Sequence, residues 1–359
     1  MLEPQEFREE IKKKMKKISK IIVLCRKAAQ QKSSFASSNS KPPRFDLANK
    51  LVEEKEMKND KKIDVRMYAV ENDKAAFVEV SVIDVDAKEH VGLFLVDSGC
   101  TSNKLSTSIK MMVGDKSQLI RTLKTQTVGN QIVEEEVFSF PFTIGGCHFV
   151  DEFTLIEENL LTGVGDKPIL GILGNPFLRN NSLVIDFGSH RIYTSEVSLD
   201  NLSFSDFSYF FPMVPGLESY GVPVVPIMGD DGGIFAMVDT GCTDLLVAEG
   251  ALEKISGEIK YNGKTTEMHS IAGTMNCRDG NLSFSIIGLQ EQNEGLKKKE
   301  YPFLETVTVA PVKSICSLEQ CQEKEGEEIP DVGILLGSPF IASDGWILDF
   351  GANIIYRRK

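Results

Sequence analysis

The chain has 359 residues, of which 42% are apolar and 26% charged, and its formal net charge is -12 at pH 7. This composition is ordinary for a globular protein and excludes collagen-like, mucin-like and wholly disordered classes. No apolar run approaches the roughly 18 residues that a membrane helix needs. We therefore expect no membrane span, and the lack of a signal-peptide pattern predicts a cytoplasmic protein.

The N-terminal segment predicts a basic helix followed by a linker. Within residues 1–30, apolar side chains recur at helical spacing with lysines between them: Ile11, Met15, Ile18, Ile22 and Cys25. A serine-rich stretch at 33–40 and two prolines after it are typical of a linker. Residues 1–61 form an extension with 16 Lys and Arg against 9 Asp and Glu.

From about residue 62 the sequence predicts a mainly β protein. Short runs rich in Val, Ile, Phe and Thr alternate there with Gly, Asn and Asp clusters, as in strands and hairpins. This body carries 24 basic against 43 acidic residues. Because an acidic surface repels phosphates, we expect no nucleic-acid partner.

The cysteines and histidines predict no metal site and no disulfide framework. Seven cysteines are spread thinly through a long chain, which favours reduced thiols. The four histidines show no ligand spacing. We expect neither a metal nor a cofactor.

The most informative feature of the sequence is an internal repeat. The run VDSGCT at 96–101 recurs as VDTGCT at 238–243. A second block, 174–188, recurs at 337–351 with the same spacing between its Gly-x-Pro-Phe start and its Asp-Phe-Gly end. Two copies are too few for a solenoid and suggest a two-lobed body. We divide it at residue 200, into 62–200 and 201–359.

Each copy places an aspartate at the end of an apolar run. If the two copies pair symmetrically, Asp97 and Asp239 meet at the axis. Two carboxylates that lie about 3 Å apart cannot both ionise, so they share a proton. Such a pair can activate a water as general base while its protonated member polarises a carbonyl.

These residues resemble the catalytic signature of aspartic proteases, in particular retropepsin-like ones. The resemblance rests on Asp97-Ser98-Gly99, on Asp239-Thr240-Gly241 and on the downstream apolar-Gly elements, and it covers roughly residues 65–358. It implies a two-lobed acid-protease-type β-barrel fold with pseudo-twofold symmetry. The implied roles are catalysis by the two aspartates and support of the active site by Ser98, Gly99, Thr240 and Gly241. It also implies an extended peptide or protein substrate and a monomer that forms an intrachain pseudo-dimer.

The resemblance also suggests two substrate-binding flaps. Glycine-containing turns follow each aspartate at a suitable distance, at Val128, Gly129 and Asn130 and at Ala272 and Gly273. Backbone groups there could bond an extended peptide as an added strand. The alternative is that both are ordinary hairpin turns.

Some residues depart from the family pattern. Cysteine follows each motif, at Cys100 and Cys242, and we interpret both as small packing residues rather than catalytic thiols. Asp244 in the second copy corresponds to Ser102 in the first, which predicts asymmetric substrate subsites. The Asp-Phe-Gly at 186–188 lacks every other kinase motif and is better interpreted as a strand that ends in a turn.

The sequence therefore predicts an aspartic endopeptidase that hydrolyses peptide bonds with water activated between Asp97 and Asp239. The alternative is a non-catalytic member that grips extended peptides in the same cleft, although such a cleft does not require a second acid. The basic extension could be a pro-segment lying across the acidic cleft, or a solvated or partner-binding helix.

Overall fold

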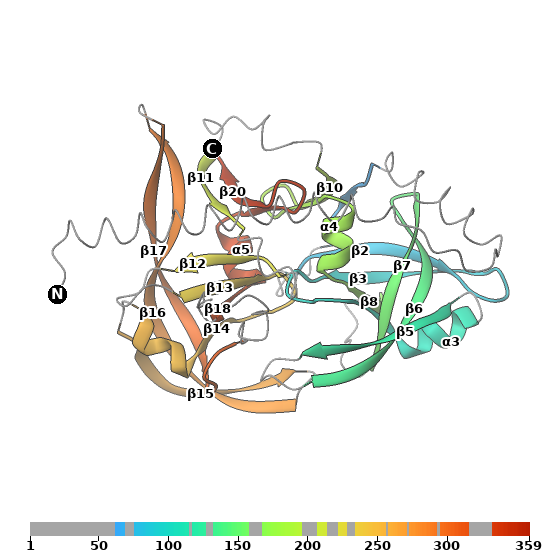
Figure 1. Ribbon diagram of the computed structural model, residues 1–359, viewed down its shortest axis with the longest axis horizontal. Helices are drawn as coiled ribbons and strands as arrows, with labels where there is room; N and C mark the ends of the chain where they lie inside the picture. The colour runs from blue at the N-terminus through green and yellow to red at the C-terminus, as the bar shows by residue number, and fades with distance from the viewer. Residues whose placement is uncertain are drawn as a thin grey trace, which may run out of the picture.

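The computed structural model describes residues 62–68, 75–114, 117–126, 132–157, 167–195, 207–213, 222–227, 234–255, 258–270, 273–292, 295–315 and 332–359. The helix expected within residues 1–30 lies outside these ranges. The described part is mainly β, as expected, and its strands form two barrel-like sheets in one chain (Figure 1).

The first sheet has seven strands, in the spatial order β2 (Phe77–Ile83), β3 (Glu89–Val96), β8 (Ile169–Leu173), β4 (Asn103–Ser106), β7 (Cys147–Ile156), β6 (Ile132–Ile144) and β5 (Gln118–Gln126). A further pairing of Ser81 with Thr143 joins β2 to β6 and closes six of these strands into a barrel. β5 extends from β6 as a hairpin partner, and α3 (Thr107–Val113) follows β4.

The second half repeats this strand order. Its ring runs through β12 (Val224–Ile227), β13 (Ile234–Asp239), β18 (Val332–Gly337), β14 (Leu245–Ala248), β17 (Gly295–Ala310) and β16 (Gly273–Gln292). Ile227 pairs with Ile286 to join β12 to β16, so this ring closes as the first one does. β15 (Lys260–Ser270) extends from β16, and the short helix η7 (Glu249–Lys254) follows β14.

A third set of strands joins the two halves. Their order is β1 (Asp64–Arg66), β10 (Arg191–Thr194), β9 (Leu183–Asp186), β19 (Ile347–Asp349), β20 (Ile354–Arg358) and β11 (Phe207–Pro212). At its centre the antiparallel pair β9 and β19 places Ile185 opposite Leu348. The short helices α4 (Asn175–Asn180) and α5 (Ser338–Ser343) precede these central strands.

The strand sequences explain these positions. In β2, Val78, Val80 and Val82 are buried while Glu79 and Ile83 are exposed, the alternation of a strand with one face on the core. By contrast, every residue of β18 is buried, as expected for a central strand covered on both faces.

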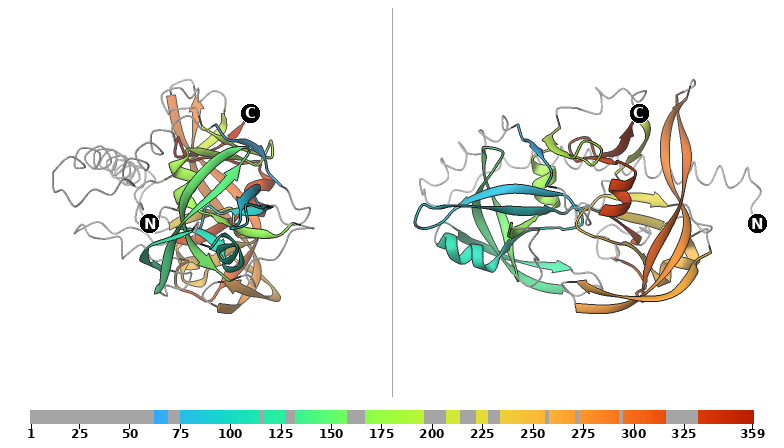
Figure 2. Two further views of the ribbon diagram at one scale, coloured as in Figure 1. Left: turned by 90° about the vertical axis from the view of Figure 1, so that its right-hand side faces the viewer. Right: turned by 180° about the vertical axis from the view of Figure 1, so that it is seen from behind.

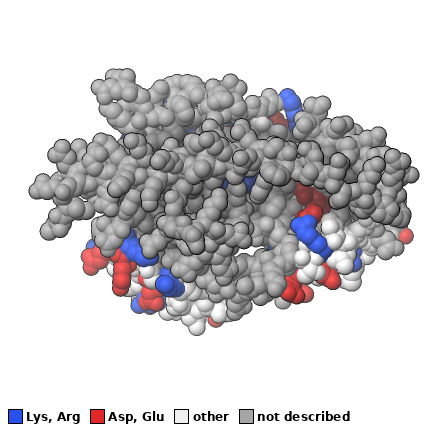
Figure 3. Space-filling model, in the orientation of Figure 1, with Lys and Arg blue, Asp and Glu red and all other residues white. Residues whose placement is uncertain are grey.

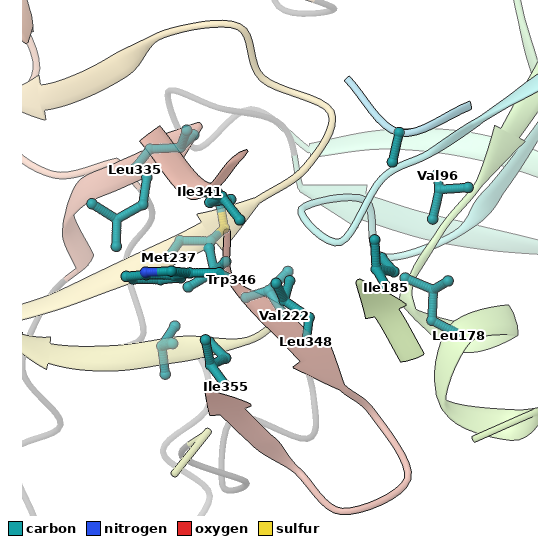
Figure 4. Packing of buried hydrophobic residues seen from close by; sticks show 14 of the residues in the cluster. Val96, Leu178, Ile185, Val222, Met237, Leu335, Ile341, Trp346, Leu348 and Ile355 are labelled. Carbon is teal, nitrogen blue, oxygen red and sulfur yellow. The ribbon is translucent and has the colours of Figure 1, made fainter. Parts of the chain in front are cut away.

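One hydrophobic core runs through both halves. Figure 4 shows Val96, Leu178 and Ile185 from the first half near Leu348 and Val222 from the second, and all five belong to one buried cluster. A phenylalanine group fills the first barrel, with ring centroids 5.4–6.3 Å apart: Phe94, Phe140, Phe142 and Phe153. The continuity of the core fixes the two halves against each other.

The β5/β6 and β15/β16 hairpins, which extend outside the rings, lie at one end of the molecule. Figure 1 and both views of Figure 2 place β5/β6 and β15/β16 at the bottom, opposite the end that carries β10 and β20. β3 and β13 lie between these two ends (Figure 1). On the face shown in Figure 3, described Lys and Arg side chains lie beside Asp and Glu side chains at both lower corners, so both signs are mixed there. Among the described residues, no helix is long and apolar enough to cross a membrane.

Candidate active site

Asp97 and Asp239 lie at the ends of equivalent buried strands. Asp97 follows β3 directly, and Asp239 is the last residue of β13. β3 pairs in parallel with β8, and β13 pairs in parallel with β18. Each of these partners also pairs antiparallel with the strand that follows the aspartate, β4 or β14. The loop that carries each aspartate therefore has a strand threaded beneath it.

This threading requires glycine where the threaded strand passes under the loop. A Cβ at Gly174 would lie 2.5 Å from the carbonyl oxygen of Ser102 and 2.7 Å from that of Cys100. A Cβ at Gly337 would lie 2.2 Å from the carbonyl oxygen of Asp244. Because backbone atoms cannot yield as side chains do, the first glycine of the repeated Gly-x-Pro-Phe run has a direct steric reason.

Ser98 and Thr240 join the two loops across the centre of the molecule. The Ser98 hydroxyl donates to the Val238 carbonyl at 2.7 Å, and the Thr240 hydroxyl donates to the Val96 carbonyl at 2.6 Å. Each hydroxyl oxygen also accepts the backbone N–H of the other residue, at 3.0 Å in both cases. Both side chains are fully buried. The Ser/Thr position of each motif therefore braces the opposite half.

Two polar residues that the sequence analysis missed also bind the two loops that carry the aspartates. The Asn175 side-chain amide donates to the Ser98 carbonyl at 2.5 Å, and the Ser338 hydroxyl donates to the Thr240 carbonyl at 2.7 Å. Both follow the glycine of the repeated Gly-x-Pro-Phe run. A polar residue at the same place in both copies, beside an otherwise apolar block, was the available signal.

The two carboxyl groups face each other across this junction. The Gly99 N–H donates to Asp97 Oδ1 at 2.8 Å, and the Gly241 N–H donates to Asp239 Oδ1 at 2.9 Å. A Cβ at Gly99 would lie 2.3 Å from Cγ of Asp239, and one at Gly241 would lie 2.3 Å from Cγ of Asp97. Each glycine thus leaves space for the opposite carboxylate, and the structure brings all six motif residues together.

The environment favours a single shared proton on this pair. Burial raises the pKa of Asp97, and the nearby Asp239 carboxylate, which is hydrogen-bonded to it, raises that pKa further. Burial also raises the pKa of Asp239, although its hydrogen bonds to Asp97 and to backbone N–H groups oppose the rise. Both residues keep part of their surface exposed, so the pair is not sealed within the core. One protonated and one ionised carboxyl can serve as paired acid and base.

The thiols beside the pair are neutral donors. Burial raises the pKa of Cys100 to about 12, and burial together with the charge of Asp239 raises the pKa of Cys242. The Cys100 Sγ donates to the Ser102 carbonyl at 3.0 Å, and the Cys242 Sγ donates to the Asp244 carbonyl at 3.5 Å. A thiol with a raised pKa is a poor nucleophile, which agrees with the interpretation of both as packing residues.

The expected flap residues fall mostly outside the described ranges. Val128, Gly129, Asn130 and Ala272 are not described, whereas Gly273 begins β16 and pairs with Ser270. The expected turns therefore connect β5 to β6 and β15 to β16. Within the described ranges, no group of three His, Cys, Asp or Glu side chains is arranged to hold a metal ion.

Replacing both aspartates by asparagine should change how stability depends on pH. Because burial raises the folded-state pKa of both carboxyls, the native protein binds more protons than the unfolded chain above the ordinary pKa of 3.8. The pair therefore makes its full contribution to the free energy of unfolding at pH values below the ordinary pKa. This contribution is lost as the pH rises through the folded-state pKa. We expect the Asp97→Asn/Asp239→Asn variant to gain stability over the parent at pH 7 and little at pH 3. Urea unfolding at both pH values measures this, and an equal gain at both would contradict it.

The fold and the site together define a mainly β protein with two barrel-like sheets and one paired-carboxylate centre where they meet. A scan against protein-family models and a search of the curated proteins both return no match for this chain.

Proposed function

We propose that this protein is an aspartic endopeptidase, in which Asp97 and Asp239 activate water to hydrolyse a peptide bond. The observation that carries the proposal is the pair of facing carboxyls. They come from equivalent strand ends, they are held by the glycine N–H groups of their own loops, and both have raised pKa values. A peptide-binding cleft without catalysis would not require two facing acids in this arrangement.

The proposed chemistry uses only this pair and water. The ionised carboxylate takes a proton from the water as the oxygen of that water bonds to the carbonyl carbon of the peptide. The protonated carboxyl hydrogen-bonds the carbonyl oxygen as negative charge develops there. The pair now holds two protons, and one of its carboxyls gives a proton to the nitrogen as the carbon–nitrogen bond breaks, which returns the pair to its singly protonated state. Ser98 and Thr240 hold both loops in register throughout.

We also propose that the chain has the two-lobed acid-protease fold, with pseudo-twofold symmetry between lobes 62–200 and 201–359. The matching strand orders of the two rings and the reciprocal hydrogen bonds of Ser98 and Thr240 support this. Because one chain supplies both aspartates, the proposed active form is a monomer. The proposed substrate is an extended peptide that pairs with backbone groups of the β5/β6 and β15/β16 hairpins.

A peptide-library digestion between pH 4 and 7 tests this function. We expect cleavage within peptides, at sites that are the same throughout this range, and inhibition by a statine-type transition-state mimic, whose hydroxyl occupies the place of the attacking water. The matched control is the Asp97→Asn/Asp239→Asn variant, purified in the same way. Binding of library peptides without any cleavage at any pH would favour the non-catalytic alternative.

A further inference from the structure

The first half contains a buried ion pair near the carboxyl centre. The Lys104 side chain is only 4% exposed, and its Nζ contacts the carboxylate of Glu135, which is 15% exposed. A buried lysine is rare unless it is paired, because desolvation of an ammonium group is costly. The ion pair Arg278–Glu249 is far more open, with side chains that are 50% and 51% exposed.

Lys104 lies where the strand after Asp97 packs tightly against the threaded strand. It follows Asp97 by seven residues and lies on β4, opposite Ile172 of the threaded strand β8. A Cβ at Gly171 would lie 2.3 Å from the Lys104 carbonyl oxygen, so the backbones are packed tightly there. The positive charge of Lys104 also acts on Cys100, where it opposes the rise in thiol pKa caused by burial.

Glu135 lies on the part of the β5/β6 hairpin that extends beyond the barrel. Residues Phe138–Ile144 of β6 pair with β7, whereas the preceding residues, from Ile132 to Val137, pair with β5 only. Glu135 is in this outer part, opposite Leu123. Its contact with Lys104 therefore ties the projecting end of the β5/β6 hairpin to the strand that follows Asp97.

In the second half, apolar residues occupy the two equivalent positions. Lys104 and Leu246 occupy the same position after their aspartates, beside Thr154 and Thr308 respectively. Glu135 lies three residues before Phe138, which pairs with Phe153 of β7. Cys277 lies three residues before Gly280, which pairs with Val307 of β17. Leu246 and Cys277 are 2% and 1% exposed and belong to the hydrophobic core. The two hairpins are thus anchored by different chemistry.

We propose that Lys104 and Glu135 are positioning residues that fix the β5/β6 hairpin relative to Asp97 through a buried ion pair. The inference rests on the proposed function, in which the hairpins hold the substrate over the carboxyl pair. An ion pair requires a narrower geometry than an apolar contact, because each buried charge must stay on its partner. The first hairpin is therefore held at a defined position, whereas the apolar anchor of the second tolerates small shifts.

The test replaces the ion pair by apolar residues of similar volume. Glu135→Gln removes the carboxylate that pairs with the buried Lys104 ammonium, and Lys104→Met removes the cation that pairs with Glu135, so both single variants should be less stable to urea. The double variant Lys104→Met/Glu135→Leu removes both charges and should recover most of the stability. In this double variant we expect amide hydrogen exchange in residues 118–126 and 132–137 to be about tenfold faster than in the parent. We expect KM for peptide cleavage to rise about tenfold while kcat changes little.

A merely structural pair gives a different result. If the stable double variant shows parental exchange or parental KM, the positioning role is wrong. The matched control is Arg191→Gln/Asp64→Asn, which removes an exposed ion pair between β10 and β1, away from both hairpins, and should alter neither readout. If the apolar double variant does not fold, the charge-swapped Lys104→Glu/Glu135→Lys variant replaces it. The swap should restore exchange protection relative to Glu135→Gln, and no recovery would overturn the inference.

If the parent cleaves no peptide, the proposed function fails, and the exchange data alone decide whether the pair fixes the hairpin.

Discussion

Replacing Asp97 or Asp239 by asparagine should lower kcat/KM for peptide cleavage by at least about 10⁴-fold. Asparagine keeps the shape of the side chain and still accepts the N–H of Gly99 or Gly241, but it cannot exchange a proton with water. Since the two carboxyls act as one unit, each single variant should lose about as much activity as the double variant. Initial rates on a fluorogenic peptide derived from the library digestion measure this.

The controls for this experiment separate chemistry from folding and from assembly. Both variants should unfold cooperatively and should still bind an uncleaved peptide, because the glycine and hydroxyl contacts remain. Mixing the Asp97→Asn chain with the Asp239→Asn chain should restore no activity, since each chain must supply both acids. Full cleavage by either single variant would show that the pair is not the catalytic centre.

Replacing Thr240 by valine should lower the free energy of unfolding by about 2–4 kcal/mol and abolish activity, because two hydrogen bonds at a fully buried site are lost. The Val96 carbonyl loses its donor, and the Ser98 N–H loses its acceptor, while the shape of the side chain is kept. Because the two loops are then no longer joined, the carboxyls of Asp97 and Asp239 are no longer held at a fixed position relative to each other. Urea unfolding and peptide cleavage measured on the same preparation test both parts.

Thr240→Ser is the matched control for this variant. Serine keeps the hydroxyl, and the first half already carries serine at the equivalent position, with the same pair of bonds in reverse. We expect this variant to retain most of the stability and activity of the parent. A Thr240→Ser variant as damaged as Thr240→Val would mean that the hydroxyl bridge alone does not hold the loops, because serine keeps the hydroxyl.

Local patterns were enough to predict the strands and the repeat. Alternating burial in β2 and continuous burial in β18 follow from their sequences. The equal spacing of the two copies predicted that the aspartates would meet, and the structure brings Asp97 and Asp239 together. By contrast, the sequence analysis saw Asn175 only as the variable position of the repeated Gly-x-Pro-Phe run, because its contact with the Ser98 carbonyl spans 77 positions.

The sequence by itself determined that two copies of one motif each end a buried strand with an aspartate, because strand periodicity, glycine placement and motif spacing are local properties. Only the tertiary structure decided how these copies act on each other. Ser98 and Thr240 exchange hydrogen bonds across 142 positions, and Asp239 raises the pKa of Asp97 because the fold places the two carboxyls together. The pairing of Lys104 with Glu135, and its replacement by Leu246 and Cys277 in the second half, were likewise decided by strand register. Coulombic and hydrogen-bond energies depend on distance in space, and a linear pattern does not contain that distance.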